Sequence, residues 1–342
     1  MKTLKVDIKK RCGEFVLSVK FETASDRFAL LGASGSGKSM TLKCIAGIEK
    51  PDEGFICLGD RVLFDSSRKI NVPCRERKVG YLFQDYALFP NMTAFENINL
   101  ICRDNARTEE LLKKFNIEGC SALKPAKMSG GQCQRVALAR MLASDPEVIL
   151  LDEPFSALDN YMHTIIEREI MDVLSGFDGP SVLVSHDRNE VYRMCGTIGV
   201  MDNGSLIDVQ DKTGFFEHPA TVVSARLTGC KNITALTADG FASDWGIQLE
   251  LPGVSGAAKF AGYRAHFFEM VGAEQKGKPN VFEVEVERVI EDTFSRVICF
   301  RQKGNKSESP DSLLTYITGK DTDAGDVKFL KVDHSRLIIL ER

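Results

Sequence analysis

The feature that most constrains this chain is a glycine-rich octapeptide that follows an apolar run, Phe28 to Leu31. Its residues are Gly32, Ala33, Ser34, Gly35, Ser36, Gly37, Lys38 and Ser39. They match the phosphate-binding pattern G-x-x-x-x-G-K-[ST], which requires a strand before it and a helix after it. The glycines allow successive backbone N–H groups to point at phosphate oxygens, and the helix N-terminus adds partial positive charge. A glycine-rich turn with a surface lysine is the alternative, but residues 39–46 continue as a helix. The octapeptide therefore predicts an α/β sheet with a phosphate site, in which Lys38 lies against the outer phosphates.

A second stretch places two carboxylates at the end of a buried strand. Ser129 and Gln132 fit a capping box at the start of a helix. The apolar run 148–151 then ends at Asp152 and Glu153. Adjacent acids at the carboxyl end of a parallel strand lie where open α/β sheets usually bind ligands. This stretch therefore predicts a ligand site on the same sheet as the phosphate loop.

Two other predicted strands end in polar side chains, one at Gln84 and one at His186. A lone Gln carries no signal, and a lone His at a strand end is usually structural. Because His186 follows other strands that end in reactive groups, it is a candidate third point of the site. Ser39 is positioned to ligate Mg²⁺, and Asp152 to hold the same ion directly or through water.

The composition is that of a soluble globular protein with room for two domains or one large one. The chain has 342 residues and a net charge of −4, which gives no support to a nucleic-acid partner. No apolar run approaches the ~20 residues that cross a bilayer, and residues 1–13 lack the apolar core of a signal peptide. We therefore expect a cytosolic chain that reaches a membrane only through a partner. Ten scattered cysteines show no paired C-x-x-C spacing and are expected to be reduced thiols rather than a zinc or redox site.

The remaining periodicity predicts mixed elements up to about residue 228 and short strands beyond it. Helices are expected at 39–46, 108–115, 132–143, 160–175 and 187–195, strands at 3–9 and 15–23, and hairpins at 55–64 and 197–209. From about Cys230, alternating segments predict a small β-barrel or sandwich. These segments are 246–251, 264–270, 282–290, 296–301, 313–318 and 327–340.

Two interpretations of aromatic residues stay open. Phe15 could stack on a nucleotide base, although an inward-facing strand residue is the more common case. The aromatic residues of loop 85–92 could form a docking surface or plug into the core. Thr93 and Glu96 offer a second capping box just after this loop.

Across residues 1 to about 228 the chain resembles the ATP-binding cassette of ABC transporters. The resemblance rests on six motifs in order: GASGSGKS (32–39), Gln84, MSGGQ (128–132), VILLDEP (148–154), SALD (156–159) and His186. Met128 and Cys133 depart from the usual leucine and glutamine. Residues 229–342 resemble the TOBE-type regulatory domain of importer cassettes. The implied fold is an α/β P-loop NTPase cassette with a helical subdomain (1–228), followed by a small all-β domain (229–342).

The resemblance implies a role for each motif. Lys38 and the loop amides would hold the β- and γ-phosphates of ATP, while Ser39, Gln84 and Asp152 would surround Mg²⁺. Glu153 would orient or deprotonate the attacking water, and His186 would contact the γ-phosphate. Cassettes of this family pair head to tail, so that one group of residues serves the nucleotide of the partner copy: Ser129, Gly130, Gly131 and Gln132. Asp159 would lie at that interface.

The resemblance also implies partners and a cargo. A homodimer of cassettes would drive integral membrane permease subunits docked near residues 85–98, at the cytoplasmic face of the membrane, with an extracytoplasmic binding protein delivering the solute. The sequences of residues 77–98 and 225–233 most resemble those of the molybdate and sulfate importers. The resemblance therefore favours molybdate or tungstate as the transported solute, then sulfate, then sugar, polyamine or iron. A soluble ABC ATPase acting on ribosomes or DNA is the alternative from another class. The second domain could bind the anion or only stabilise the dimer.

Overall fold

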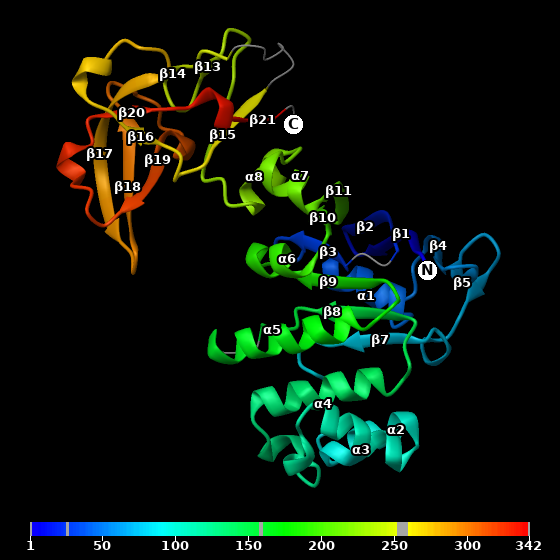
Figure 1. Ribbon diagram of the computed structural model, residues 1–342. Helices are drawn as coiled ribbons and strands as arrows, with labels where there is room; N and C mark the ends of the chain where they lie inside the picture. The colour runs from blue at the N-terminus through cyan, green and yellow to red at the C-terminus, as the bar shows by residue number, and fades with distance from the viewer. Residues whose placement is uncertain (1, 25–26, 157–159, 252–258, 341–342) are drawn as a thin grey trace. The chain divides into compact units, whose positions relative to one another are not determined.

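A computed structural model describes residues 2–24, 27–156, 160–251 and 259–340. The chain divides into two compact units, residues 1–212 and 213–342 (Figure 1). This division concerns packing alone, and the boundary at residue 228 stays a prediction about the limits of the cassette.

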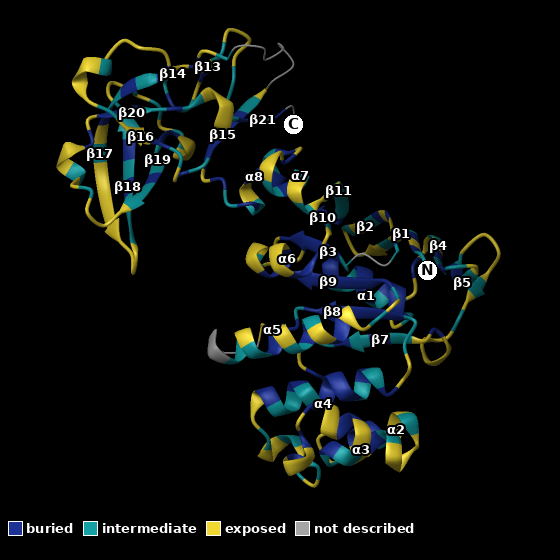
Figure 2. Cartoon of the chain, in the orientation of Figure 1, coloured by how far each residue is buried: buried dark blue, intermediate teal, exposed yellow. Residues whose placement is uncertain are grey.

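The first unit is built on an eleven-stranded mixed sheet with the order β6-β5-β4-β1-β2-β11-β10-β3-β9-β8-β7. Its strands are β1 (Leu4–Cys12), β2 (Phe15–Thr23), β3 (Arg27–Gly32), β4 (Glu53–Leu58), β5 (Arg61–Asp65), β6 (Ile70–Asn71), β7 (Val79–Leu82), β8 (Val148–Asp152), β9 (Ser181–Ser185), β10 (Thr197–Asp202) and β11 (Ser205–Asp211). Strands β10, β3, β9, β8 and β7 are mutually parallel. Strands β8 and β9 are buried at every position, as expected for parallel strands covered on both faces (Figure 2).

The half-buried strands at the other side of this sheet follow from alternation. In β1, the side chains of Leu4, Val6 and Ile8 are buried and their neighbours face outward. The predicted hairpins at 55–64 and 197–209 are confirmed as antiparallel pairs β4–β5 and β10–β11.

In the described part of the first unit, six α-helices flank or extend the sheet: α1 (Lys38–Ala46), α2 (Ala94–Cys102), α3 (Asn105–Lys114), α4 (Gly130–Leu142), α5 (Asn160–Ser175) and α6 (Arg188–Met194). Both predicted capping boxes are present, at Thr93 for α2 and at Ser129 for α4. Helices α2, α3 and α4 pack together as a helical group beside β7 (Figure 1).

The second unit is rich in short strands. Its helices are α7 (Lys212–Glu217, which begins at the last residue of the first unit) and α8 (Val222–Leu227). A three-stranded sheet holds β12 (Asn232–Ala235), β15 (Phe260–Tyr263) and β21 (Ile338–Leu340). A two-stranded ladder joins β13 (Phe241–Ala242) to β14 (Ile247–Gln248). A five-stranded sheet holds β16 (Glu269–Met270), β20 (Phe329–Lys331), β17 (Val281–Glu291), β18 (Ser295–Gln302) and β19 (Leu314–Gly319). Trp245, Tyr263, Phe268 and Phe300 are among the aromatic side chains of its core.

Three strand predictions in this unit were too long. Residues 246–251 form a strand only at 247–248, and residues 327–340 hold two strands, 329–331 and 338–340. Residues 264–270 form a strand only at 269–270, because the chain turns where Phe267 N–H donates to the Arg264 carbonyl. The turn lets Phe267 and Phe268 pack against the ring of Tyr263, and the Tyr263 hydroxyl donates to the Phe267 carbonyl. The alternation in the sequence therefore comes from an aromatic loop.

Candidate functional site

The phosphate loop (residues 32–39) connects β3 to α1 with the backbone geometry that its glycines permit. Gly35 and Gly37 have φ values of 80° and 102°, in the left-handed region that favours glycine. A Cβ at Gly37 would lie 2.6 Å from Leu17 Cδ1, so a side chain there would also be crowded. Gly37 is the N-cap of α1, and no side chain caps this helix start. The loop therefore leaves backbone donors at the helix N-terminus for an anion.

Lys38 is almost fully buried at this helix start. Its ammonium donates to the carbonyl oxygens of Gly32 at 2.9 Å and Ala33 at 2.8 Å. Burial lowers the pKa of Lys38, and the carboxylates of Glu153 and Asp152 act in the opposite direction. The hydroxyl of Ser36 is also buried and has no hydrogen-bond partner among the described residues. The Lys38 ammonium, which donates to carbonyls, and the unpaired Ser36 hydroxyl lie in the same glycine-rich loop. Both groups could donate hydrogen bonds to the oxygens of a bound phosphate.

Ser39 and Asp152 meet across the sheet although 113 residues separate them. Ser39 Oγ donates to Asp152 Oδ1 at 2.7 Å. The other carboxylate oxygen, Oδ2, accepts a hydrogen bond from the Tyr81 hydroxyl at 2.8 Å. A serine hydroxyl beside a carboxylate supplies the hard oxygen ligands that Mg²⁺ prefers, so the pair fits the cation that accompanies a nucleotide.

Tyr81 is a site residue that the sequence reasoning missed. Burial, followed by the Asp152 carboxylate, raises the pKa of its phenol, which is therefore neutral at ordinary pH. A signal for this contact was present in the pairing of the two parallel strands. Tyr81 aligns with Leu150, and Asp152 lies two residues further along on the same face.

One pocket gathers most of the predicted residues of the phosphate site. It is lined by Phe15, Ser34, Gly35, Gly37, Lys38, Ser39, Met40, Lys43, Gln84 and Glu153. Gln84 and Glu153 thus lie at the same pocket as Lys38 and Ser39. Phe15 packs on the core of the sheet, as expected for a strand residue, and it also lines the pocket. Its stacking on a nucleotide base stays a prediction.

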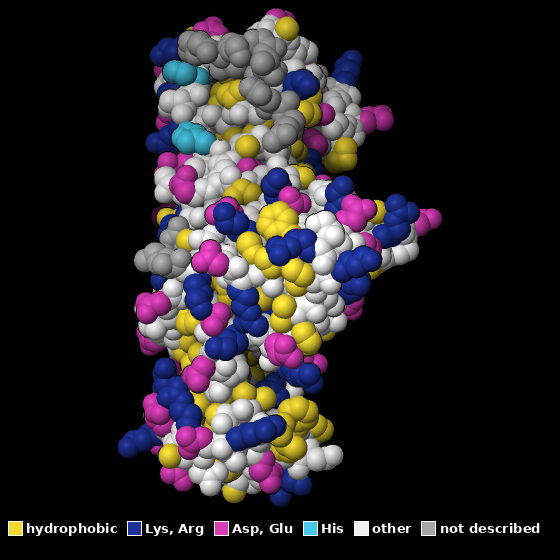
Figure 3. All heavy atoms as spheres, turned by 90° about the vertical axis from the view of Figure 1, so that its right-hand side faces the viewer, with side chains coloured by type: hydrophobic (Ala, Val, Ile, Leu, Met, Phe, Trp, Pro, Cys, Tyr) yellow, Lys and Arg dark blue, Asp and Glu magenta, His cyan; other side chains and the backbone are white. Residues whose placement is uncertain are grey.

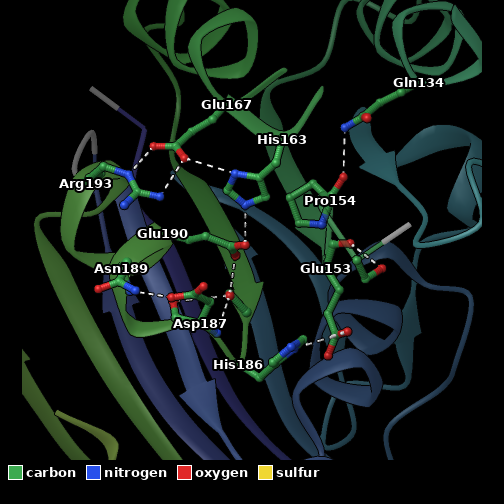
Figure 4. Close-up of polar contacts among 12 residues, drawn as sticks. Gln134, Glu153, Pro154, His163, Glu167, His186, Asp187, Asn189, Glu190 and Arg193 are labelled. Atoms are coloured by element: carbon green, nitrogen blue, oxygen red, sulfur yellow. Dashed lines mark hydrogen bonds and ion pairs between the residues drawn. The ribbon is translucent and has the colours of Figure 1, made fainter. Parts of the chain in front are cut away.

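Glu153 and His186 point toward one another at the ends of neighbouring strands (Figure 4). Glu153 Oε2 lies 3.5 Å from His186 Nδ1, and the His186 side chain is largely exposed. Glu153 has a φ of 44°, a left-handed conformation that is strained for a residue with a Cβ. Its N–H donates to the Val184 carbonyl, which fixes this conformation from β9. Such strain is concentrated at functional sites.

A buried polar network supports the turn that carries His186. His163 Nε2 lies 2.8 Å from Glu190 Oε1, and Glu190 Oε2 accepts a hydrogen bond from Ser185 at 2.5 Å (Figure 4). Ser185 Oγ in turn accepts the N–H of Asp187 at 2.9 Å. The two residues on either side of His186 are therefore held by one chain of hydrogen bonds that begins on α5.

The same network includes a second buried acid that the sequence reasoning also missed. Glu167 receives two hydrogen bonds from Arg193, at 2.5 and 2.7 Å, and lies 3.6 Å from His163 Nδ1. The side chain of His163 is therefore placed between two carboxylates from α5 and α6.

The capped start of α4 is separate from this pocket. None of Ser129, Gly130, Gly131 and Gln132 lines the pocket of the phosphate loop as the structure describes it. Ser129 and Gly130 are exposed to solvent. Asp159, also predicted at an interface, lies outside the described residues.

Helix α4 is tied to the strand end by a contact that was not predicted. Gln134 is fully buried, and its side-chain amide donates to the Pro154 carbonyl at 2.8 Å (Figure 4). The Tyr86 hydroxyl donates to Gln134 Oε1, the amide oxygen of the same side chain, at 3.3 Å. Gln134 thus connects the capped helix, the residue after Glu153 and the loop that follows Gln84.

The loop between β7 and α2 is held by hydrogen bonds to one buried side chain and is partly apolar at its surface. Asn97 donates to the carbonyls of Phe89, Met92 and Thr93 and accepts the Phe89 N–H. Tyr86 is buried, but the Phe89 ring is 44% exposed under the Arg140 guanidinium. The aromatic residues of this loop are therefore divided between core and surface.

Figure 3 shows basic and acidic side chains interspersed on the face that it presents.

The strand–loop–helix, with its buried lysine and its serine–aspartate pair, defines a P-loop nucleotide-binding domain. The family model described as ABC transporter matches residues 17–156. The molybdate/tungstate import ATP-binding protein WtpC of Archaeoglobus fulgidus is 39% identical over 211 residues, which cover 60% of this chain and 85% of that protein. The chain belongs to the ABC transporter family, and its cassette is of the ABC ATPase type. The predicted fold class, a P-loop α/β cassette followed by a small β domain, is confirmed.

Other relatives carry different cargo names at similar identity. The molybdenum import ATP-binding protein ModC of Paramagnetospirillum magneticum is 38% identical over 209 residues, covering 59% of this chain and 58% of that protein. Relatives named for putrescine, glucose, sulfate and iron match at 36, 38, 35 and 39% identity. The chain spans about three fifths of the length of the relatives named for molybdenum, putrescine and glucose, 58 to 60% of each protein.

A solved structure matches the cassette. It is the dimeric post-hydrolysis state of an ATP-binding cassette bound to ADP and Pi, with a TM-score of 0.52 and 28% identity, over 62% of this chain and 99% of that one. In the part of our chain that the structure describes, no helix has both the length and the apolar character needed to span a bilayer.

Proposed function

We propose that this chain is the ATP-hydrolysing subunit of an ABC importer, and that it energises uptake of an oxyanion, molybdate or tungstate in the first place. The observation that carries the ATPase assignment is one pocket at which Lys38, Ser39, Gln84 and Glu153 meet. Phosphoryl transfer depends mainly on positioning and on charge stabilisation, and these residues offer both.

Each residue has a distinct task in this proposal. Lys38 exchanges its two loop carbonyls for the outer phosphates of ATP, which keeps a buried cation paired. Ser39, Gln84 and Asp152 would hold Mg²⁺, which neutralises phosphate charge when bound. Glu153 orients the attacking water and accepts its proton, and His186, facing Glu153, contacts the γ-phosphate.

The proposal includes a second copy of the chain. An exposed helix N-terminus with two glycines is an anion site, and here it lies away from the phosphate pocket of its own chain. We assign Ser129, Gly130, Gly131 and Gln132 to the nucleotide of the partner copy, and Asp159 to the interface. The dimeric state of the similar cassette structure supports this assignment.

The permease and the cargo form the finer part of the proposal. An apolar groove beside the loop after Gln84 is lined by Ile48, Phe83, Phe89, Ile101 and Met141 among others. We place cytoplasmic helices of an integral membrane permease there, so that the chain acts at the cytoplasmic face of the membrane while an extracytoplasmic binding protein delivers the anion. The names of two similar proteins support molybdate or tungstate. Sulfate, iron, polyamine or sugar are the alternatives.

The ATPase assignment is tested with Glu153→Gln. This change keeps the size of the side chain but removes the base, so ATP hydrolysis should fall by a factor on the order of 10²–10⁴. ATP should still bind and should convert the variant to a dimer at micromolar protein, measured by light scattering after size exclusion. Glu147→Gln is the matched control, since Glu147 pairs with Lys2 and Lys78 away from the phosphate loop. Full turnover by Glu153→Gln would remove Glu153 from the mechanism, and a variant that stays monomeric with ATP would contradict the shared site.

The cargo and the class of machine are tested in cells. Affinity purification from membranes should recover a polytopic membrane protein, whereas ribosomes or DNA would support the soluble alternative. Deletion of the gene should reduce uptake of labelled molybdate, and competition with tungstate and sulfate should rank the anions. Unchanged molybdate uptake would refute the cargo.

A further inference from the structure

The carboxylate of Asp152 is held from both sides by hydroxyl groups. Ser39 donates to Oδ1 at 2.7 Å and Tyr81 donates to Oδ2 at 2.8 Å. An ionised carboxylate only accepts hydrogen bonds, so both hydroxyls must donate. Asp152 is buried, and these two bonds fix the plane of its carboxylate. Oδ1 is thereby turned toward Ser39, the residue that opens the helix after the phosphate loop.

The ring of Tyr81 is fixed independently of its hydroxyl. It packs on the core of the sheet and lies 4.3 Å from the Phe83 ring, centroid to centroid. It also forms part of the wall of the apolar groove beside β7. A phenylalanine would fill this space as well as a tyrosine does. Packing therefore does not require the Tyr81 hydroxyl, which instead donates a hydrogen bond to Asp152.

We propose that Tyr81 is a positioning residue that sets the Asp152 carboxylate for binding the divalent cation that accompanies the nucleotide. This inference rests on the proposed function. With Oδ2 occupied by Tyr81, Oδ1 faces the Ser39 side, where the cation would be shared. Without the phenol, the carboxylate is free to rotate about its last side-chain bond. Hydrogen bonds from outside the ligand set typically change metal affinity by about 10- to 100-fold, because they orient the ligand.

A metal-binding measurement on the full chain tests the proposal without relying on turnover. Mn²⁺ is titrated by electron paramagnetic resonance in the presence of the non-hydrolysable analogue AMP-PNP, with wild type and Tyr81→Phe compared. We expect Tyr81→Phe to bind Mn²⁺ about 10-fold more weakly. Its affinity for AMP-PNP without metal should equal that of wild type, because Lys38 and the loop are untouched. Tyr263→Phe is the control, since it removes a tyrosine hydroxyl that donates to the Phe267 carbonyl in the second unit and should leave Mn²⁺ affinity unchanged.

A double-mutant cycle tests whether Tyr81 acts through Asp152. In the Asp152→Asn background, Tyr81→Phe should cause no further loss of Mn²⁺ affinity, since the carboxylate that it orients is gone. Equal Mn²⁺ affinity of wild type and Tyr81→Phe would overturn the inference. So would a variant that loses metal-free nucleotide binding, because that result identifies a structural role. If wild type itself binds no nucleotide, the proposed function fails instead, and the two failures are distinguishable.

Discussion

Arg77 offers the sharpest test of how the phosphate loop is anchored. Its guanidinium is completely buried, and burial lowers the pKa of this group. It donates to the carbonyls of Cys44 and Ile45 at 2.9 and 2.8 Å, at the C-terminal end of α1. It also donates to the Val72 carbonyl at 2.8 Å and to the Asn71 side chain at 2.9 Å. The helix that begins at the phosphate loop is therefore held at its other end by one cation.

The cost of replacing Arg77 by Met follows from these partners. The Cys44 carbonyl keeps the Gly47 N–H, and Val72 is partly exposed, so the Ile45 carbonyl is the acceptor most fully deprived of a donor. A buried acceptor without a donor costs about 1–3 kcal/mol. The lost attraction between the cation and the helix C-terminus adds about 0.3–2 kcal/mol. We therefore expect Arg77→Met to lower the free energy of unfolding of the first unit by about 3 kcal/mol.

Urea denaturation measures this loss, and the chain contains its own control. The only tryptophan is Trp245, buried in the second unit, so tryptophan emission follows that unit while far-UV circular dichroism follows the helices of the first. With a denaturant slope of about 2–3 kcal/mol per M, the circular dichroism midpoint should fall by about 1–1.5 M. The Trp245 midpoint should not move. Arg77→Lys should restore only the attraction to the helix end, because an ammonium lacks the planar fork. A midpoint loss corresponding to less than about 1 kcal/mol would refute the anchoring role.

Three further predictions concern other parts of the chain. His163→Gln should lower kcat for ATP hydrolysis roughly tenfold and leave KM unchanged, because it weakens the support of the His186 turn and not the phosphate loop. Steady-state ATPase assays measure both constants, and an unchanged kcat would contradict this prediction. Gly130→Ala should leave the free energy of unfolding unchanged or higher by about 0.5–1 kcal/mol. It should nevertheless weaken ATP-driven dimer formation, and a variant that dimerises normally would contradict this prediction. Burial raises the pKa of Cys44 and Cys195 to about 12 and of Cys230 to about 11, so iodoacetamide at pH 8 should label exposed Cys12 and Cys74 and spare these three in peptide maps. Because a raised thiol pKa favours the neutral form in the folded state, the same three thiols should make folding stability fall as the pH rises above about 9.

The parts of the site that the sequence predicted depend on signals within a few residues. The phosphate loop is one octapeptide, and each capping box joins residues three positions apart. These local signals have one physical solution each, and the structure adopts it. Helices α7 and α8 were missed because six residues each are too few to display helical periodicity.

The contacts that were missed join residues far apart in the chain. Tyr81 and Asp152 are 71 residues apart, His163 and Glu190 are 27 apart, and Gln134 lies 20 residues before Pro154. A single sequence carries no record of which side chains meet across strands and helices. Strand pairing recovers the first contact, because it follows from register. The network around His163 requires the actual packing of α5 on α6, which no period in the sequence defines.

The two adjacent glycines at the start of α4 separate a packing requirement from a functional one. A Cβ at Gly131 would lie 2.3 Å from Met162 Cε, the flexible end of that side chain, so within one chain this position is tight. A Cβ at Gly130 would meet no atom within 4 Å, and its φ is not in the left-handed region. Glycine in a helix interior is disfavoured relative to alanine by about 1 kcal/mol, and no contact among the described residues requires a glycine at Gly130, the first residue of α4. We attribute this glycine to a close approach from outside: in the proposed dimer, the phosphate of the partner's nucleotide would come against the bare backbone at this position. The Gly130→Ala variant therefore separates the two explanations, since it relieves the helix and obstructs only the approach.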